Sequence, residues 1–205
     1  MGFMMKLSTV YKKAFEDDCF ELIVNAYNRA IAEKKYQHNW IENDFSELLG
    51  HYVNESHFSL AKRITCKTEN KLFSQIDNQV KGFADKSPRI DFVYFKVWKM
   101  ERFHCYMEAK RLKEKDSGLK RAYINDGMDR YISEKYPIGC MIGYLIEGKT
   151  NETIIGINSL LEKDIRNTET LIPKPNKLLK TYYESNHSDL GTLKHLIFEF
   201  TNTSN

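Results

Sequence analysis

The residues best suited to chemistry lie at positions 103–113, in the stretch FHCYMEAKRLK. If this stretch is a β-strand, successive side chains point to opposite faces of a sheet. One face is then apolar, whereas the other carries, in order, His104, Tyr106, Glu108 and Lys110. A half-buried strand whose polar side faces water produces the same pattern, because charged pairs on one face of a sheet are common. The stretch alone therefore leaves both interpretations open.

Asp91 is the second unusual residue, because it interrupts the apolar run RIDFVYFKV at positions 89–97. The β-branched and aromatic residues of this run predict a strand. A carboxylate buried in such a strand is costly unless a partner or a metal compensates its charge. Asp91 is therefore a candidate functional residue.

The two strands are expected to pair as an antiparallel hairpin, closed by a four-residue loop at positions 98–101. The expected register pairs Asp91 with Glu108, Val93 with Tyr106 and Phe95 with His104. Asp91, Glu108 and Lys110 then share one face of neighbouring strands. The predicted unit is two carboxylates beside one ammonium group.

Two close carboxylates repel one another, and one of them holds a proton unless a cation lies between them. A hard divalent ion such as Mg²⁺ suits this unit, because it binds one or two carboxylates and keeps several waters. Such an ion can activate a water and orient a phosphate. Lys110 beside it can hold the attacking water or neutralise charge on the phosphorus. The expected cofactor is Mg²⁺, with Mn²⁺ able to replace it.

The sequence from Asp91 to Glu108-Ala109-Lys110, seventeen positions later, resembles the core motif of the PD-(D/E)XK phosphodiesterases. That superfamily includes restriction, repair and antiphage nucleases. The resemblance covers about residues 39–148 and includes the order of elements: a helix, a three-strand antiparallel meander, a helix and a strand. The proline that commonly precedes the aspartate is replaced here by Ile90.

This resemblance implies a role for each matching residue. Asp91 and Glu108 would bind the metal through their carboxylates, and Ala109 would add its backbone carbonyl oxygen. Lys110 would be the catalytic lysine.

Many members of the family add an acid from the helix that precedes the sheet. In WIENDFSELL the candidate is Glu42, since it shares the presumed inner face of the helix with two apolar residues, Phe45 and Leu49. Asp44 and Glu47 are weaker candidates on the same helix. Glu69, at the end of the strand before Asp91, is a further candidate metal ligand.

The elements that position these residues follow from hydrophobic spacing. Helices are expected at about positions 7–35, 39–52, 117–135 and 151–164. Strands are expected at about positions 61–69, 89–97, 103–112, 139–148 and 194–200. Their order predicts an α/β fold, a mixed central β-sheet with an antiparallel hairpin flanked by helices, which the resemblance makes a restriction-endonuclease-like core.

Two units are expected along the chain: an N-terminal helical segment at residues 1–36 and a nuclease-like domain at residues 37–205. The first is expected to serve dimerisation or regulation. In the third predicted helix, Gly127 is expected to allow close packing on the sheet.

Composition narrows the choice of partners only slightly. The 31 Lys and Arg against 28 Asp and Glu give a net charge of +3, which is not the strongly basic footprint of many nucleic-acid-binding domains. A local basic cluster nevertheless follows the motif: Lys110, Arg111, Lys113, Lys115, Lys120 and Arg121. It is either a solvated face or a surface that follows a phosphate backbone.

The four cysteines show no zinc-binding spacing. Neither a signal peptide nor an apolar run of membrane-spanning length is found, so a cytoplasmic protein without membrane contact is expected.

The expected function is therefore a Mg²⁺-dependent nuclease, a DNA endonuclease in preference to a ribonuclease. Restriction or antiphage defence is the expected context, with the chain acting as a homodimer or within a defence complex. Two alternatives stay open: a catalytically silent nuclease-fold domain that binds nucleic acid or protein, and an interaction domain in which the acids form an ion-pair network. His187 is expected in a polar loop without an identifiable partner, and His195 is expected to be structural.

Overall fold

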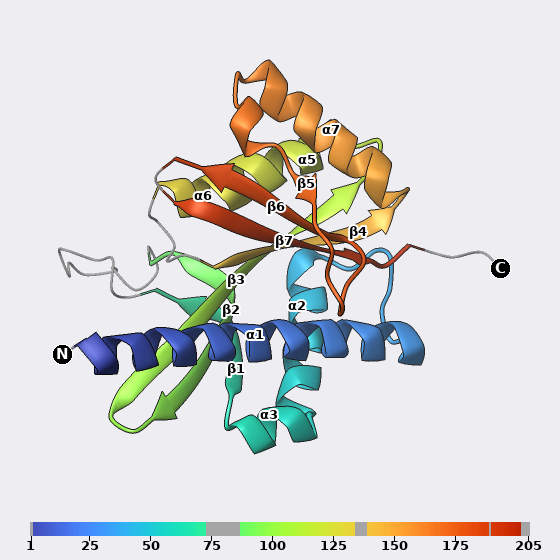
Figure 1. Cartoon of the computed structure of the whole chain (residues 1–205). Coiled ribbons are helices and arrows are strands. Elements are labelled where there is room, and N and C mark those ends of the chain that lie inside the picture. The colour runs from blue at the N-terminus through green and yellow to red at the C-terminus, as the bar shows by residue number, and fades with distance from the viewer. Residues whose placement is uncertain (1, 73–86, 134–138, 189, 202–205) are drawn as a thin grey trace.

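A seven-stranded mixed β-sheet with helices on both faces organises the protein (Figure 1). The computed structural model describes residues 2–72, 87–133, 139–188 and 190–201. Strand order across the sheet is β1-β2-β3-β4-β7-β6-β5. The expected α/β fold with a mixed, helix-flanked sheet and an antiparallel hairpin is confirmed.

The sheet has a parallel central part between two antiparallel parts. An antiparallel meander comprises β1 (Thr65–Lys71), β2 (Arg89–Trp98) and β3 (Glu101–Lys113). Next to it, β4 (Cys140–Glu147) runs parallel to β3, and β7 (Gly191–Glu199) runs parallel to β4. The far edge is antiparallel and comprises β6 (Tyr182–His187) and β5 (Ile172–Pro173).

Helices α1 (Gly2–Glu33) and α2 (Glu42–Glu55) share a core cluster with one face of the sheet, and the short α3 (His57–Lys62) follows α2. Figure 1 shows α1, in blue, lying across the strands. The buried side chains of α1 that enter this core are Phe15, Cys19, Phe20, Leu22, Ile23, Val24, Ala26 and Ala30. The N-terminal helix thus packs on the same sheet as the candidate site, and its role in dimerisation or regulation stays a prediction.

The opposite face of the sheet is covered by a second set of helices. It comprises α5 (Ser117–Tyr123), the π-helical turn η2 (Ile124–Met128), α6 (Asp129–Ile132), α7 (Thr150–Lys163) and the 3₁₀ turn η3 (Asn167–Glu169). Gly127 lies where η2 crosses β4, and a Cβ atom there would come within 2.3 Å of the Met141 side chain. This close approach agrees with the packing role expected of that glycine.

The predicted hairpin register is confirmed. Val93 pairs with Tyr106 and Phe95 pairs with His104, as expected from placing Asp91 opposite Glu108. The predicted four-residue loop is wrong, because the strands continue until Trp98 pairs with Glu101. Only Lys99 and Met100 remain in the turn, and Lys99 adopts a left-handed conformation with φ 46° that allows so tight a reversal.

Two segments differ from the sequence-based expectation. Residues 61 and 62, expected to begin a strand, instead end helix α3, whose start is capped by the Ser56 hydroxyl. The supposed polar loop around His187 is strand β6. Its sequence YYESNH lacks an apolar alternation because the buried side chains Ser185 and His187 are polar and contact polar partners.

Those partners form a buried polar chain between the helical layer and the sheet. Tyr123 hydrogen-bonds His195 Nδ1 at 2.8 Å, and His195 Nε2 lies 2.8 Å from the Ser185 hydroxyl. The same hydroxyl lies 2.7 Å from His187 Nε2, and His187 Nδ1 lies 2.9 Å from a Glu169 carboxylate oxygen. His195 is therefore structural, in agreement with the expectation, whereas the expectation that His187 occupies a loop is wrong.

Among the described residues, no helix combines the length and the hydrophobicity required to cross a membrane. All four cysteines are buried free thiols.

Acid should weaken the fold through His195. Burial lowers the pKa of His195 to about 3, so the folded state keeps it neutral while the unfolded chain protonates it near pH 6.5. Below that pH the unfolded state binds more protons than the folded state. The free energy of unfolding therefore decreases as the pH is lowered from about 6.5 to about 3. From pH 6 to pH 4.5, urea titrations should show the wild-type protein losing about 2 kcal/mol more than His195→Gln does.

A matched control is His57→Gln, because His57 is exposed at the start of α3. Its unfolding free energy should follow the pH dependence of the wild-type protein. Equal pH slopes for His195→Gln and the wild type would contradict the assignment of His195 as a buried neutral base.

Candidate functional site

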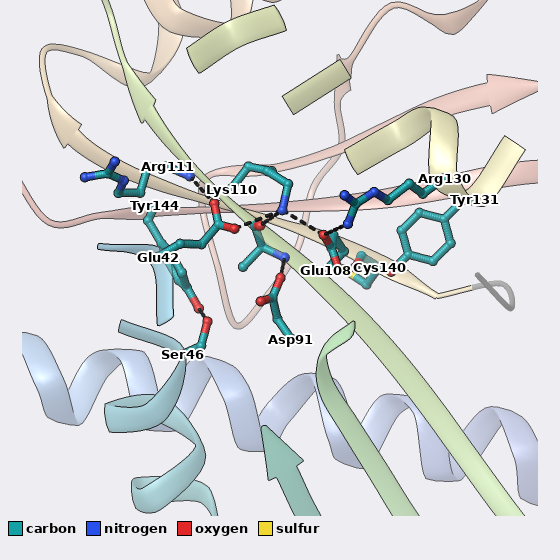
Figure 2. Close-up of polar contacts among 11 residues, drawn as sticks. Glu42, Ser46, Asp91, Glu108, Lys110, Arg111, Arg130, Tyr131, Cys140 and Tyr144 are labelled. Atoms are coloured by element: carbon teal, nitrogen blue, oxygen red, sulfur yellow. Dashed lines mark hydrogen bonds and ion pairs between the residues drawn. The ribbon is translucent and has the colours of Figure 1, made fainter. Parts of the chain in front are cut away.

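Asp91, Glu108 and Lys110 lie together where β2 and β3 separate (Figure 2). All three are buried, with 5%, 2% and 9% of their surfaces exposed respectively. Charged side chains are rarely buried to this extent without partners, so their contacts define the site.

At this point of β3, carboxylate groups accept the backbone hydrogen bonds that β2 no longer accepts. The regular β2–β3 ladder ends at Phe92 and Met107. Beyond it, the Ala109 N–H donates to Asp91 Oδ2 at 2.6 Å, and the Arg111 N–H donates to Glu42 Oε2 at 3.1 Å. Alternate N–H groups point to the same edge of a strand, so both donors face the side that β2 has left. Asp91 and Glu42 thereby satisfy backbone groups that the ladder no longer pairs.

The ammonium group of Lys110 lies at the centre of the site (Figure 2). It donates to Glu42 Oε1 at 2.9 Å, to Glu108 Oε1 at 2.7 Å and to the Ala109 carbonyl oxygen at 2.7 Å. An ammonium group has three N–H donors, and these contacts use all of them. Lys110 therefore links helix α2 to two consecutive residues of β3.

Glu108 is the most buried acid of the site and is only partly satisfied. Its Oε1 atom accepts from Lys110 and, at 3.1 Å, from Arg130 Nη1 on helix α6. Its Oε2 atom is buried and has no hydrogen-bond partner among the described residues. An unpartnered carboxylate oxygen in a buried position is costly, and it is the kind of group that a cation would satisfy.

Electrostatic effects within the site oppose one another. Burial raises the pKa of Asp91, and the charge of Glu108 raises it further, against a smaller opposing effect of Lys110. Burial likewise raises the pKa of Glu108, whereas Lys110 and Arg130 lower it. Burial would lower the pKa of Lys110, but the charges of Glu108, Glu42 and Asp91 outweigh it and raise that pKa above its ordinary value. Lys110 is therefore a permanent cation, whereas the two buried acids are charged at a cost.

Helix α2 positions Glu42. Glu42 is the first residue of α2, and Phe45 and Leu49 on the same helix are fully buried against the sheet. The Ser46 hydroxyl lies 3.0 Å from the Tyr144 hydroxyl of β4, which ties this helix to the middle of the sheet. The Glu42 side chain keeps 25% exposure and reaches Lys110 from the solvent side.

Helix α6 positions Arg130 from the opposite side of the site. The neighbouring Tyr131 donates its hydroxyl to the Cys140 carbonyl of β4 at 3.1 Å. Asp129 is held by Arg166 at 2.7 Å. These contacts hold the short helix against the start of β4 and direct Arg130 to Glu108 (Figure 2).

The prediction brought together Asp91, Glu108, Ala109, Lys110 and Glu42, and these five residues do meet in the structure. The weaker candidates have other partners. Asp44 accepts from the Ile41 N–H at the start of α2, and Glu47 accepts from the Thr68 hydroxyl at 2.6 Å.

Glu69 lies between Thr68 and Asn70, the partners of Phe92 and Ile90, and therefore across from Asp91. It adopts a left-handed conformation with φ 48° that interrupts the regular ladder. Its role as a metal ligand stays a prediction.

Arg130 and Arg111 are the members of the site that sequence reasoning missed. Arg130 lies in a predicted helix twenty-two residues after Glu108, and no spacing rule joins the two. Arg111 belongs to the basic cluster that follows the motif. Its backbone N–H holds Glu42, and its guanidinium group donates to the Trp40 carbonyl at 3.1 Å. The adjacency of Arg111 to the motif was the one available signal.

The donor set fits a hard divalent ion. Asp91 and Glu108 supply carboxylate oxygens, and the unpartnered Glu108 Oε2 is one of them. Among the described residues, no group of three or more His, Cys, Asp or Glu side chains is arranged to hold a metal. Mg²⁺ does not need such a group, because it binds through one or two carboxylates and retains waters.

Comparison with known proteins found no matching family model, curated protein or solved structure. The resemblance to the PD-(D/E)XK nucleases therefore depends on the motif and on the order of the elements.

Removing the central cation should destabilise the fold strongly. Lys110→Met should lower the unfolding free energy by about 3–5 kcal/mol at pH 7 without divalent ions, because Glu108 and Glu42 lose their buried partner. A carboxyl group whose pKa is raised by folding destabilises the folded state as pH rises above its ordinary value near 4. Because folding raises the pKa of Glu108, the deficit of the variant should be smaller at pH 5 than at pH 7. Urea titrations at both pH values measure this change.

Lys113→Met is the matched control, since Lys113 lies three residues after Lys110 on the same strand and pairs with the exposed Glu147. It should cost about 1 kcal/mol or less. A deficit for Lys110→Met that is as large at pH 5 as at pH 7 would show that lost packing, and not unbalanced charge, explains the effect.

Proposed function

We propose that this protein is a Mg²⁺-dependent nuclease that hydrolyses phosphodiester bonds. The observation that carries the proposal is the buried pair Asp91 and Glu108, in which one Glu108 oxygen lacks a partner while the Lys110 ammonium lies beside the other. Two buried acids with raised pKa values form an unfavourable arrangement in a purely structural role. A divalent ion would remove that cost.

Asp91, Glu108 and the Ala109 carbonyl are the groups that would hold the ion, which when bound supplies a polarised water and charge neutralisation for a phosphate. Lys110 contributes a permanent positive charge beside the reacting phosphate. Glu42 restrains the direction of that ammonium group through its 2.9 Å contact.

Arg130 adds a second cation at the edge of the site. The Arg130 side chain keeps 31% exposure while its guanidinium group contacts Glu108. It can therefore contact a substrate phosphate while α6 stays in place. Arginine suits this contact because its planar guanidinium group binds two phosphate oxygens at once.

DNA in preference to RNA, a role in restriction or antiphage defence, a cytoplasmic location and a homodimeric or complexed state belong to this proposal. Support for them comes from the resemblance to the nuclease family alone.

A catalytically silent binding domain is the second candidate. Lys110 bonds the Ala109 carbonyl and Glu108 Oε1, two of the oxygens assigned to the metal. A binding domain without catalysis would keep these oxygens paired with Lys110 and would take up no divalent ion.

Supercoiled plasmid, incubated with a Mg²⁺ or Mn²⁺ series, should be nicked or linearised by the wild-type protein. Asp91→Asn and Glu108→Gln should reduce the rate at least ~100-fold, because each removes a charged ligand while keeping the side-chain shape. Lys110→Ala should lower turnover by a similar factor but change the metal concentration for half-maximal rate less. Linear and single-stranded DNA and RNA belong in the same series.

Glu147→Gln serves as the control, because Glu147 is an exposed acid at the end of β4 that pairs with Lys113. It should cut as fast as the wild type. Cleavage that persists in Glu108→Gln would show that the site is misassigned, and intact substrate in every reaction would favour the silent binding domain.

A further inference from the structure

A basic groove extends along the meander on the same side as the candidate site. It has a volume of about 460 Å³ and is lined by residues of β1, β2 and β3. Every charged side chain that lines the groove is basic: these are Lys67, Lys71, Lys96 and Arg102, together with His104. This sign of charge is complementary to a phosphate backbone.

Aromatic rings lie between these basic side chains. The rings of His104 and Tyr106 are 6.0 Å apart and nearly parallel, with an interplanar angle of 18°. Phe95 pairs with His104 across the hairpin, and the Lys67 ammonium lies 5.6 Å from the Phe95 ring centre. Unpaired nucleobases stack on surfaces of this kind, in which aromatic rings alternate with basic side chains.

The groove and the candidate site belong to one continuous face. On β3, Arg102, His104 and Tyr106 are followed at the same two-residue step by Glu108 and Lys110. On β2, Phe95 and Val93 are followed in the same way by Asp91. Arg102 is six residues from Glu108, which corresponds to about 20 Å along the strand. A nucleic-acid strand lying in the groove would therefore lead directly to the carboxylates of Asp91 and Glu108.

We propose that this groove binds a single-stranded segment of nucleic acid and directs it into the site. Phosphates contact Lys67, Lys71 and Arg102, while unpaired bases stack on His104 and Tyr106. The orientation of the rings decides between single strand and duplex, because paired bases do not expose the faces on which a side chain stacks. The inference deepens the proposed function and depends on it for the reaction, but not for the binding.

Fluorescence anisotropy with a short labelled oligonucleotide, in EDTA, isolates binding from cleavage. The wild-type protein should bind the single strand at least tenfold more tightly than a duplex of the same sequence. Lys67→Glu with Arg102→Glu should weaken single-strand binding at least tenfold and reduce the slope of log affinity against log salt by about 1.4, for two lost phosphate contacts. His104→Ala should weaken binding by about fivefold or more.

Two further variants serve as controls. Lys12→Glu with Lys13→Glu reverses two exposed charges on α1, which covers the other face of the sheet, and should change affinity less than twofold. Tyr106→Phe keeps the stacking ring and should bind like the wild type. Deoxyribose and ribose strands are compared in parallel, and the ratio of their affinities identifies the natural strand.

Unchanged affinity in the groove variants, an equal loss in the α1 control, or preference for the duplex would each overturn the proposal. Plasmid cleavage identifies which inference has failed. Cleavage by a protein whose groove variants bind normally refutes the groove alone, whereas groove-dependent binding without any cleavage refutes the nuclease and leaves the groove.

Discussion

The contact set of Lys110 is the interaction on which the rest of the site depends. One ammonium group joins the start of α2, through Glu42, to Glu108 and the Ala109 carbonyl of β3. Without it, three carboxylates would face one another in a largely buried space, with Arg130 at the edge. Such an arrangement is tolerated only when cations hold it together. The site therefore requires positive charge at its centre, and Lys110 supplies part of it.

The surrounding fold keeps these groups in place by ordinary means. The β2–β3 ladder stops at Phe92 and Met107, and the backbone donors released there are taken by Asp91 and Glu42. Both acids thus have a structural role beside the chemical one that we propose. Because each holds a backbone N–H, each is fixed in direction before any ligand arrives. Preorganisation of this kind favours a binding site over a solvated cluster of charges.

Local pattern was sufficient to predict the meander, its register and the shared face of Asp91, Glu108 and Lys110, whereas Ala109 and Glu42 were added by the resemblance to the nuclease family. Period-two alternation fixes which side chains share a face, and a one-residue slip would have buried the wrong set. The sequence could not reveal β6, because its inward side chains Ser185 and His187 are polar and contact His195 on β7 and Glu169 in η3, which lie on other elements. Arg130 was missed for the same reason: a contact between α6 and β3 has no local signature.

The central claim is that Asp91 and Glu108 form a divalent-cation site, and calorimetric titration of the protein with Mn²⁺ tests it most directly. The account predicts saturable binding by the wild-type protein and by Glu147→Gln, and loss of that binding in Asp91→Asn. It also predicts a higher melting temperature for the wild type in Mn²⁺. Absence of binding, or equal binding by Asp91→Asn, would contradict the claim and leave Lys110 and its acids as a structural ion-pair network.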